Sequence, residues 1–238
     1  MKLTADNSLP LYVKLTNQLR KDIENGNYQK GEKIPTEQEL CKIYNVSRIT
    51  VRNALKALSK ERLLVRLQGK GTYVANEKFK RDISRSSSFT QICLETGQIP
   101  GAKVVKCIIE DANPLDIKEL NLKPDDKVIA LERIRYANNI PVAFEISRFP
   151  ESFSFLLQEE LNNSSLINVL TKKHNIILGY CTKCIELVYA SYELSHYLEI
   201  NEGYPLISII SLTCDSENKP IHRSLQYVVG DKFKFYIN

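Results

Sequence analysis

The sequence predicts an α+β protein with a small, mainly helical unit followed by a larger unit built on a mostly antiparallel sheet. Three observations support this prediction. Apolar residues recur at helical spacing up to about residue 60, and they alternate as in strands through much of the remaining chain. Charge is divided as well, because residues 1–75 hold 14 Lys and Arg against 7 Asp and Glu, and residues 76–238 hold 19 against 21. A basic unit of +7 joined to a unit of −2 is typical of a polyanion-binding module attached to a module with another task.

Composition narrows the class of protein. The 238 residues are 43% hydrophobic and 26% charged, which is the balance of a folded chain long enough for one or two domains. The longest apolar runs are far shorter than the ~20 residues that a membrane-spanning helix needs, and the N-terminus does not resemble a secretory signal. We therefore expect a cytoplasmic protein with no membrane partner. In that compartment the six cysteines are expected to be reduced thiols.

The first unit is expected to contain three helices. The first has apolar residues every fourth position and ends near Gly26; its apolar positions are Leu11, Leu15, Leu19 and Ile23. The second begins at Thr36, where Glu39 completes a capping box, and it breaks at Asn45. Ser47 then caps the third helix. Two helices joined by so short a turn form a helix-turn-helix.

The third helix, within VSRITVRNALKAL, carries cations beside its apolar side. At 100° per residue, the apolar arc of roughly 100° contains Val51, Ala54, Leu55 and Leu58. The next arc, of roughly 80° on the same spacing, contains Arg48, Arg52 and Lys56. Such a helix fits the major groove of DNA, where Arg can bind guanine with two hydrogen bonds. The alternative interpretation is an ordinary solvated charged surface.

A short hairpin with a basic tip follows, because LLVRLQ and TYVA alternate in polarity on either side of GKG. It would make the unit a winged helix-turn-helix. The wing either contacts DNA or merely closes the core of the unit.

Residues 9–75 resemble the DNA-binding domain of the gluconate-operon-repressor (GntR) family of bacterial transcription regulators. The motifs that carry the resemblance are IPTEQEL, VSRITVRNAL and QGKGTYV. It implies DNA contacts from Arg48, Thr50 and Arg52 on the third helix, and from Gly69 and Lys70 at the wing tip. Gln38 stands where the family often has Arg, so its contact with a base or phosphate is a further expectation.

The larger unit is predicted over residues 88–238, after a polar and basic linker over residues 76–87. A short helix in SFTQICLETG begins it. Six strand-like runs follow, AKVVKCIIE, KVIALERIRYA, PVAFEISRF, TKCIELVYA, PLISIISLTC and PIHRSLQYVV. Three helical stretches lie between them, ESFSFLLQEEL, SSLINVLTKKH and ASYELSHYL. This pattern predicts a mainly antiparallel sheet flanked by helices.

Arg133 and Arg135 are two apart on a predicted strand, so both side chains leave the same face of the sheet. If that face is buried, the two guanidinium groups require an anion, and a phosphate would accept their paired hydrogen bonds. Both arginines could instead lie on a solvated face. Glu145, on the paired strand, is either a ligand contact or a surface acid.

Residues 88–236 are similar to the effector-binding domain of the HutC branch of this family, the UTRA domain, which has a chorismate-lyase-like fold. The resemblance rests on SFT, ERIRYANNIPVAFE, NNSSLINVL and KPIHRSLQYVVGDKFKF. It implies homodimerisation and binding of a small metabolite, often a sugar phosphate or a carboxylate. The ligand contacts expected from the residues and the resemblance together are Ser88, Phe89, Thr90, Arg133, Arg135, Glu145, Ser165 and His222. Ser88 and Ser165 could equally be plain helix caps, and Ile167, His222, Val228 and Val229 depart from the pattern expected of phosphosugar binders.

The sequence thus predicts a ligand-responsive transcription regulator, most simply a repressor of a catabolic or uptake operon that binds a palindromic operator as a dimer. No catalytic residues, metal ligands or cofactors are predicted. Three alternatives stay open: an enzyme of chorismate-lyase-like fold fused to a DNA-binding module, a metal protein using Cys181 and Cys184, and a general DNA-coating protein.

Overall fold

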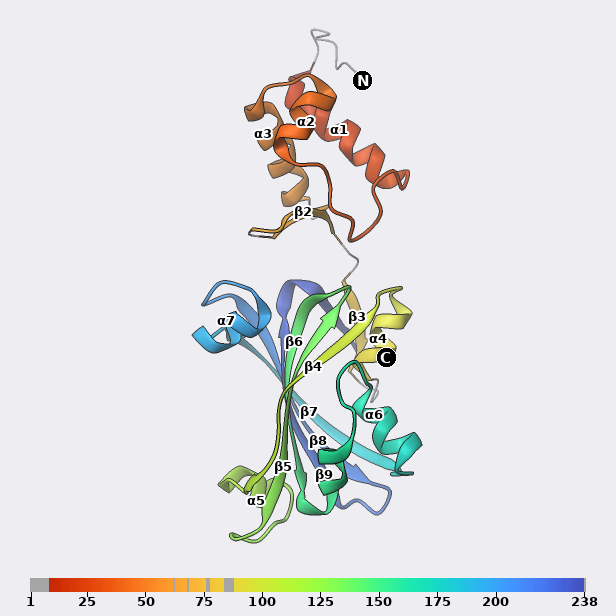
Figure 1. Ribbon diagram of the computed structural model, residues 1–238, viewed down its shortest axis with the longest axis vertical. Helices are drawn as coiled ribbons and strands as arrows, with labels where there is room; N and C mark the ends of the chain where they lie inside the picture. The colour runs from red at the N-terminus through yellow and green to blue at the C-terminus, as the bar shows by residue number, and fades with distance from the viewer. Residues whose placement is uncertain (1–8, 62, 68, 76–77, 84–87, 238) are drawn as a thin grey trace. The chain divides into compact units, whose positions relative to one another are not determined.

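The protein is described from a computed structural model that covers residues 9–61, 63–67, 69–75, 78–83 and 88–237. The chain divides into two compact units, residues 1–77 and 78–238 (Figure 1), and each has its own hydrophobic core. Within the described ranges, no helix combines the length and the apolar character needed to cross a membrane.

The first unit has the three predicted helices, α1 (Leu11–Glu24), α2 (Glu37–Tyr44) and α3 (Arg48–Lys60). The capping box at the start of α2 is present, since Thr36 and Glu39 each accept a hydrogen bond from the other's backbone. Asn45 ends α2 in the left-handed conformation with φ of 53°, and Ser47 caps α3. These local bonds fix the turn between α2 and α3, which confirms the helix-turn-helix.

The core of this unit is closed by the predicted hairpin. Strands β1 (Leu64–Leu67) and β2 (Gly71–Val74) are antiparallel. Leu64 and Val74, which are opposite each other in this pair, are buried against the apolar sides of the helices. Complete burial of one such side chain stabilises the fold by about 1.5–3 kcal/mol.

The second unit is built on one antiparallel six-stranded sheet of order β4-β5-β6-β9-β8-β7. Its strands are β4 (Pro100–Asp111), β5 (Lys127–Ala137), β6 (Ile140–Pro150), β7 (Leu178–Tyr189), β8 (Pro205–Asp215) and β9 (Pro220–Val229). All six were expected from alternating polarity. The turn between β5 and β6 is made by Asn138 and Asn139, both with positive φ, as the asparagine pair predicts.

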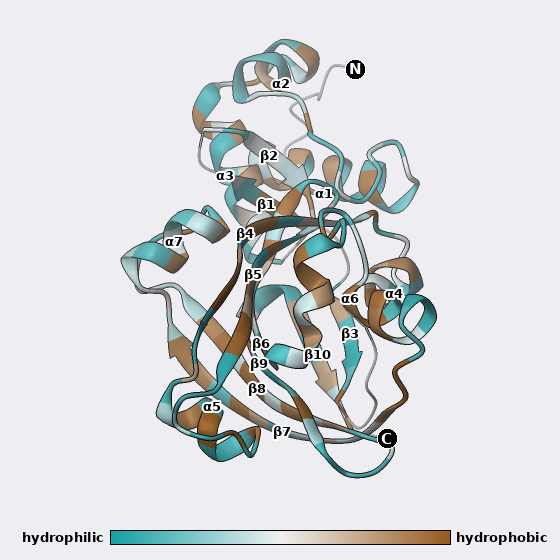
Figure 2. Cartoon of the chain, turned by 60° about the horizontal axis from the view of Figure 1, so that its bottom comes forward, coloured by the Kyte–Doolittle hydropathy of each residue, from teal (hydrophilic) through white to brown (hydrophobic). Residues whose placement is uncertain are grey.

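Helices cover both faces of this sheet. On one face α4 (Phe89–Glu95) and the short α6 (Leu166–Asn168), continued by the π-helical turn η2 (Val169–Lys173), pack on apolar residues of β5, β6, β8 and β9. On the other face α7 (Tyr192–Leu198) packs on β6, where the Tyr197 ring stacks on Phe144 at 4.6 Å. Figure 2 shows apolar residues along the sheet strands and on α6.

Three short elements of this unit were not expected or differ in type. Helix α5 (Pro114–Glu119) was not predicted. The stretch ESFSFLLQEEL forms a 3-10 helix, η1 (Glu151–Gln158), and another, η3 (Gly230–Lys232), follows β9.

The prediction of a linker over residues 76–87 needs correction. Within that range β3 (Phe79–Asp82) forms a parallel pair with β10 (Phe233–Tyr236) at the other end of the unit. The Phe79 side chain is buried and its ring stacks on Phe233 with centroids 4.8 Å apart. One aromatic residue and a distant partner strand thus hold a segment whose polar composition suggested a linker. Residues 76, 77 and 84–87 lie outside the described residues.

Candidate functional site

Helix α3 separates its apolar and cationic sides as the sequence predicts. Val51, Ala54 and Leu58 are completely buried against α1 and α2, whereas Arg48 and Arg52 are exposed. Burial of the apolar side fixes the rotation of the helix, because turning it would bring Leu58 into water and a guanidinium group into the core. The cations are therefore held at the surface, where they can meet a polyanion.

Glu37, at the start of α2, lies between α3 and the hairpin. Its carboxylate is 3.4 Å from Arg48 Nε and 3.5 Å from Arg66 Nη2. Both arginine side chains are mostly exposed, at 68% and 72%, so these pairs contribute at most about 1 kcal/mol each. A phosphate of a nucleic acid can therefore displace Glu37 from either arginine at a cost of at most about 1 kcal/mol. Arg66, which is exposed on β1, was not predicted as a contact.

The other predicted DNA contacts are also accessible to different degrees. Gln38 is exposed on α2, and Gly69 and Lys70 are exposed at the hairpin turn. Gly69 has a φ of 72°, a conformation that suits glycine at this tight tip. Thr50 is half-buried, and its hydroxyl lies 2.9 Å from that of Ser47 at the cap of α3.

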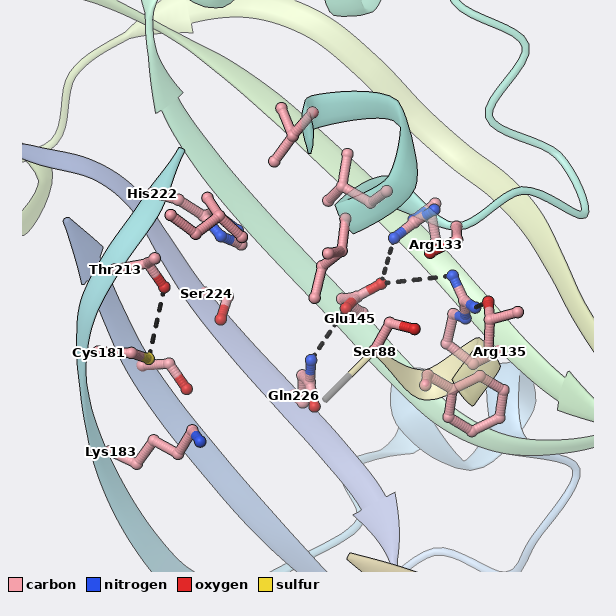
Figure 3. A pocket seen from close by; sticks show the side chains of 18 of the residues that line it. Ser88, Arg133, Arg135, Glu145, Cys181, Lys183, Thr213, His222, Ser224 and Gln226 are labelled. Carbon is pink, nitrogen blue, oxygen red and sulfur yellow. Dashed lines mark hydrogen bonds and ion pairs between the residues drawn. The ribbon is translucent and has the colours of Figure 1, made fainter. Parts of the chain in front are cut away.

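The second unit contains a pocket between the sheet and the α4 and α6 segments, with an empty volume of about 760 Å³ that includes space open to solvent. Figure 3 shows side chains from β5, β6, β7, β8 and β9 converging on it. All eight predicted ligand contacts line this pocket, namely Ser88, Phe89, Thr90, Arg133, Arg135, Glu145, Ser165 and His222.

Cross-strand register explains why residues so distant in sequence meet. Arg133 is opposite Glu145 on β6, and Glu145 is opposite Gln226 on β9. Residues directly opposite each other point to the same face of a sheet, so these three polar side chains form one row on the pocket floor.

Arg133 and Arg135 face the protein interior. They are 1% and 4% exposed, so the solvated-face alternative is wrong for both. Arg133 Nη2 donates to Glu145 Oε2 at 2.7 Å, and Arg135 Nη1 lies 3.9 Å from the same oxygen. Each arginine also donates to the Ser164 carbonyl oxygen, at 3.5 and 3.4 Å. Two buried guanidinium groups thus share one carboxylate.

Glu145 is neither a surface acid nor a free acceptor. Its Oε1 accepts a 2.9 Å bond from Gln226 Nε2, and its Oε2 is held by Arg133. Burial raises the pKa of Glu145, but the charges of Arg133 and Arg135 outweigh burial and lower that pKa to about 2. Burial lowers the pKa of Arg135 to about 10, so its guanidinium is still charged at neutral pH. At pH 7 the cluster therefore carries a net positive charge.

Donors in this cluster lack partners among the described residues. The Nε atoms of Arg133 and Arg135 and the Ser164 hydroxyl are buried without a hydrogen bond there. Unsatisfied buried donors are uncommon in folded proteins, and a bound acceptor is one explanation for them. The geometry is suited to an anionic ligand.

The serine and aromatic residues at the helix starts support this cluster. Ser88 and Ser165 cap α4 and α6 by accepting backbone hydrogen bonds, so the cap interpretation holds for both even though both line the pocket. Thr90 Oγ1 accepts from Arg135 Nη2 at 3.4 Å, and the Arg135 guanidinium lies 4.8 Å from the centroid of the Phe89 ring. Helix α4 thereby fixes the orientation of Arg135.

His222 stacks on Phe149, with ring centroids 4.2 Å apart and an interplanar angle of 3°. Its Nε2 is buried and has no hydrogen-bond partner among the described residues. Burial lowers the pKa of His222 to about 4, and Glu145 only partly offsets that effect. The imidazole is therefore neutral at pH 7.

This depressed pKa predicts an acid-sensitive fold. Because the unfolded state takes up the proton near pH 6.5 and the folded state only near pH 4, stability falls as the pH drops through that window. We expect the wild-type protein to lose about 2 kcal/mol between pH 7.5 and pH 5 from this group. In His222→Gln the loss over the same range should be smaller by that amount, as measured by urea unfolding at the two pH values. An identical pH dependence in both proteins would contradict the assignment.

Several pocket residues were not predicted. They are Arg81 on β3, Cys181 and Lys183 on β7, Ser211 and Thr213 on β8, and Ser224 and Gln226 on β9. Those on β7, β8 and β9 other than Cys181 lie in runs predicted as strands, and only the strand order shows that they share a face with Arg133. Arg81 was hidden in the range predicted as linker.

Cys181 and Cys184 do not converge. Cys181 lines the pocket, where its sulfur accepts from Thr213 Oγ1 at 3.4 Å, whereas Cys184 is exposed. Across the described ranges, no three His, Cys, Asp or Glu side chains are grouped so that they could hold a metal ion.

Comparison with known proteins matches each of the two units to a protein family model. The family model described as "Bacterial regulatory proteins, gntR family" matches residues 11–74, and the UTRA domain model matches residues 95–234. The chain is 34% identical over 237 residues to the uncharacterised HTH-type transcriptional regulator YurK of Bacillus subtilis (strain 168), which covers 99% of this chain and 98% of YurK. It is 31% identical over 219 residues to the probable fructoselysine utilization operon transcriptional repressor of Escherichia coli (strain K12), with 90% and 88% covered.

Solved structures agree on the fold. The crystal structure of PhnF from Mycobacterium smegmatis matches 96% of this chain and 98% of that chain, with a TM-score of 0.67 and 20% sequence identity. The two relatives named above are transcription regulators, which argues against the enzyme alternative. The chain therefore belongs to the gntR family of bacterial transcription regulators, in the HutC-like group whose second unit is a UTRA domain.

Proposed function

We propose that the protein is a homodimeric repressor that releases a palindromic operator when a small anionic metabolite, such as a sugar phosphate, fills the pocket. The observation that carries this proposal is the pair of buried guanidinium groups for which Glu145 is the one carboxylate partner among the described residues. A regulator that meets DNA in a bacterium is expected in the cytoplasm.

The pocket suits a phosphate or carboxylate beside Arg133 and Arg135. Such a group would neutralise the unmatched charge and accept charge-assisted hydrogen bonds, which are about twice as strong as neutral ones. The serine hydroxyls at the starts of α4 and α6 are further polar groups at this end of the pocket. The relative named for fructoselysine utilization supports a ligand derived from a sugar.

The first unit suits insertion of α3 into a major groove. Arg48 and Arg52 would reach base edges and phosphates, and Gly69 and Lys70 at the wing would contact the backbone or the minor groove. In a two-fold symmetric dimer, the half-sites lie about one helical turn apart, or a multiple of it. Site-specific binding of this kind also separates the protein from a general DNA-coating protein, because each mismatched base pair should weaken binding by about 1–3 kcal/mol.

Release is explained by a shift between two states of the dimer. The metabolite must bind more tightly to dimers whose DNA-binding units cannot occupy both half-sites together, because only differential affinity moves such an equilibrium.

The test begins with DNA fragments selected from a random pool by the purified protein. Selected fragments should share a two-fold symmetric sequence. Hexose phosphates and organic acids are then screened for thermal stabilisation, since a ligand at 100 times its Kd adds about 2.7 kcal/mol to stability. A stabilising compound should release the selected DNA from the wild-type protein.

Arg135→Ala provides the matched variant. It should bind the DNA as tightly as wild type and no longer release it on addition of the compound. Asymmetric selected sequences would refute the dimer on a palindrome, and release that is unaffected by Arg135→Ala would refute the anion site.

A further inference from the structure

The pocket has two further basic side chains besides Arg133 and Arg135. Lys183 on β7 and Arg81 on β3 both line it. Lys183 Nζ donates to the Ile83 carbonyl oxygen at 2.8 Å, and Arg81 Nη1 donates to Gln226 Oε1 at 2.7 Å. In Figure 3 Lys183 lies on the opposite side of the pocket from Arg133 and Arg135, with Glu145 and Gln226 between them.

Strand order sets the separation of Lys183 from the two arginines of β5. Between β5, which carries the two arginines, and β7, which carries Lys183, lie three strands, β6, β9 and β8. At about 4.8 Å per step, the backbones of β5 and β7 are roughly 19 Å apart along the sheet. One phosphate cannot bind both Lys183 and the two arginines of β5, since charge-assisted hydrogen bonds span only about 2.7–2.9 Å. Arg81 is on β3, outside this sheet, and is joined to Glu145 through Gln226.

The charges lining the pocket do not balance. The described lining residues include four cations, Arg81, Arg133, Arg135 and Lys183, and the single carboxylate of Glu145. Asp82 interacts with Lys183 but is not among the lining residues, and counting it still leaves two excess positive charges. Burial lowers the pKa of both Arg81 and Lys183, so their charged forms also gain from an added anion.

We propose that Arg81 and Lys183 form a second anion subsite, and that the ligand is a phosphate monoester bearing a carboxylate at its opposite end. The phosphate binds at Arg133 and Arg135 and the carboxylate at Lys183 and Arg81. A phosphate monoester carries about −1.5 to −2 charges at pH 7 and the carboxylate adds one more, so the whole ligand comes close to the three excess positive charges of the described lining residues. This inference rests on the proposed function of the pocket and specifies the class of its ligand.

The test compares two probes that differ at carbon 1, which is a ring hemiacetal in one and a carboxylate in the other. Glucose 6-phosphate and 6-phosphogluconate both carry a phosphate on carbon 6, and only the second has a carboxylate on carbon 1. Their Kd values for the full-length protein are measured by calorimetry. We expect 6-phosphogluconate to bind at least about tenfold more tightly, the usual effect of one hydrogen-bonded charge.

Variants locate the source of this preference. In Lys183→Gln the ratio of the two Kd values should fall to about 1 while the Kd of glucose 6-phosphate is unchanged. Lys183→Arg should retain the preference. Lys103→Gln, which removes an exposed lysine of β4 outside the pocket, is the matched control and should retain it too.

The outcomes separate this inference from the proposed function. If both probes bind the wild-type protein equally, or if Lys183→Gln keeps the preference, the second subsite is wrong and the anion site at Arg133 stands. If neither probe binds at 10 mM, about the weakest affinity that such a site should show, both are wrong. The ratio of the two Kd values in the wild-type protein tests the second anion subsite even if a variant fails to fold.

Discussion

Arg52→Ala is expected to weaken binding to the selected operator by about 2–6 kcal/mol, or about 30-fold or more. Arg52 is exposed on α3 and is held at the surface by the buried residues beside it. One arginine contact to a base edge is worth about 1–3 kcal/mol, and a dimer has two copies of it. Ligand-induced thermal stabilisation should be unchanged, because Arg52 belongs to the first unit and not to the pocket.

The control for Arg52→Ala is Lys21→Ala, which removes the same charge from an exposed position on α1. Affinities are measured by fluorescence anisotropy at one fixed salt concentration, for the selected operator and for an unrelated duplex. Arg52→Ala should reduce the difference between the two DNAs, and Lys21→Ala should not. Equal losses in both variants would mean that Arg52 supplies only general charge.

Arg133→Met should destabilise the second unit by about 3 kcal/mol, the lower end of the range for breaking a buried ion pair. The substitution leaves the buried carboxylate of Glu145 without its 2.7 Å partner, although Arg135 and Gln226 still lie near it. Replacing all three charged residues, in Arg133→Met with Arg135→Met and Glu145→Met, should restore much of the lost stability, since no buried charge of this cluster is then left without its partner. Neither protein should respond to the metabolite.

An exposed ion pair of the same unit serves as the control. Lys173 lies 2.6 Å from Glu159, but its side chain is 64% exposed, so Lys173→Met should change stability by less than about 1 kcal/mol. Stability is measured by urea unfolding at pH 7.5. A triple variant less stable than Arg133→Met alone would show that the cluster contributes through something other than compensation of buried charges.

The helices of the first unit could be predicted because their signals are local. Thr36 and Glu39 bind each other's backbone, and Ser47 binds the backbone of Thr50, all within three residues. The strands were predicted from local strand-like runs as well, although β5 and β6 are buried on both faces and hardly alternate. The pairing of Arg133 with Glu145 could not be predicted in this way. The turn at residues 138 and 139 pairs Tyr136 with Pro141, and continuing that register would put Phe144 opposite Arg133.

A register shift between Arg135 and Tyr136 changes this alignment, so that Arg133 faces Glu145. A bulge depends on the packing of the whole sheet, and one residue of slip reverses the face of every side chain beyond it. The position of Arg81 was unpredictable for a similar reason. Its strand is defined by pairing with β10, about 150 positions further along the chain.

The pairing of β3 with β10 joins the first and last strands of the second unit. β3 begins only a few residues after the last strand of the first unit, and it is fastened by the final strand of the chain. Arg81, within β3, donates a hydrogen bond to the side chain of Gln226, which in turn donates one to Glu145. We therefore expect a ligand that displaces Glu145 to disturb Gln226, Arg81 and the pairing of β3 with β10.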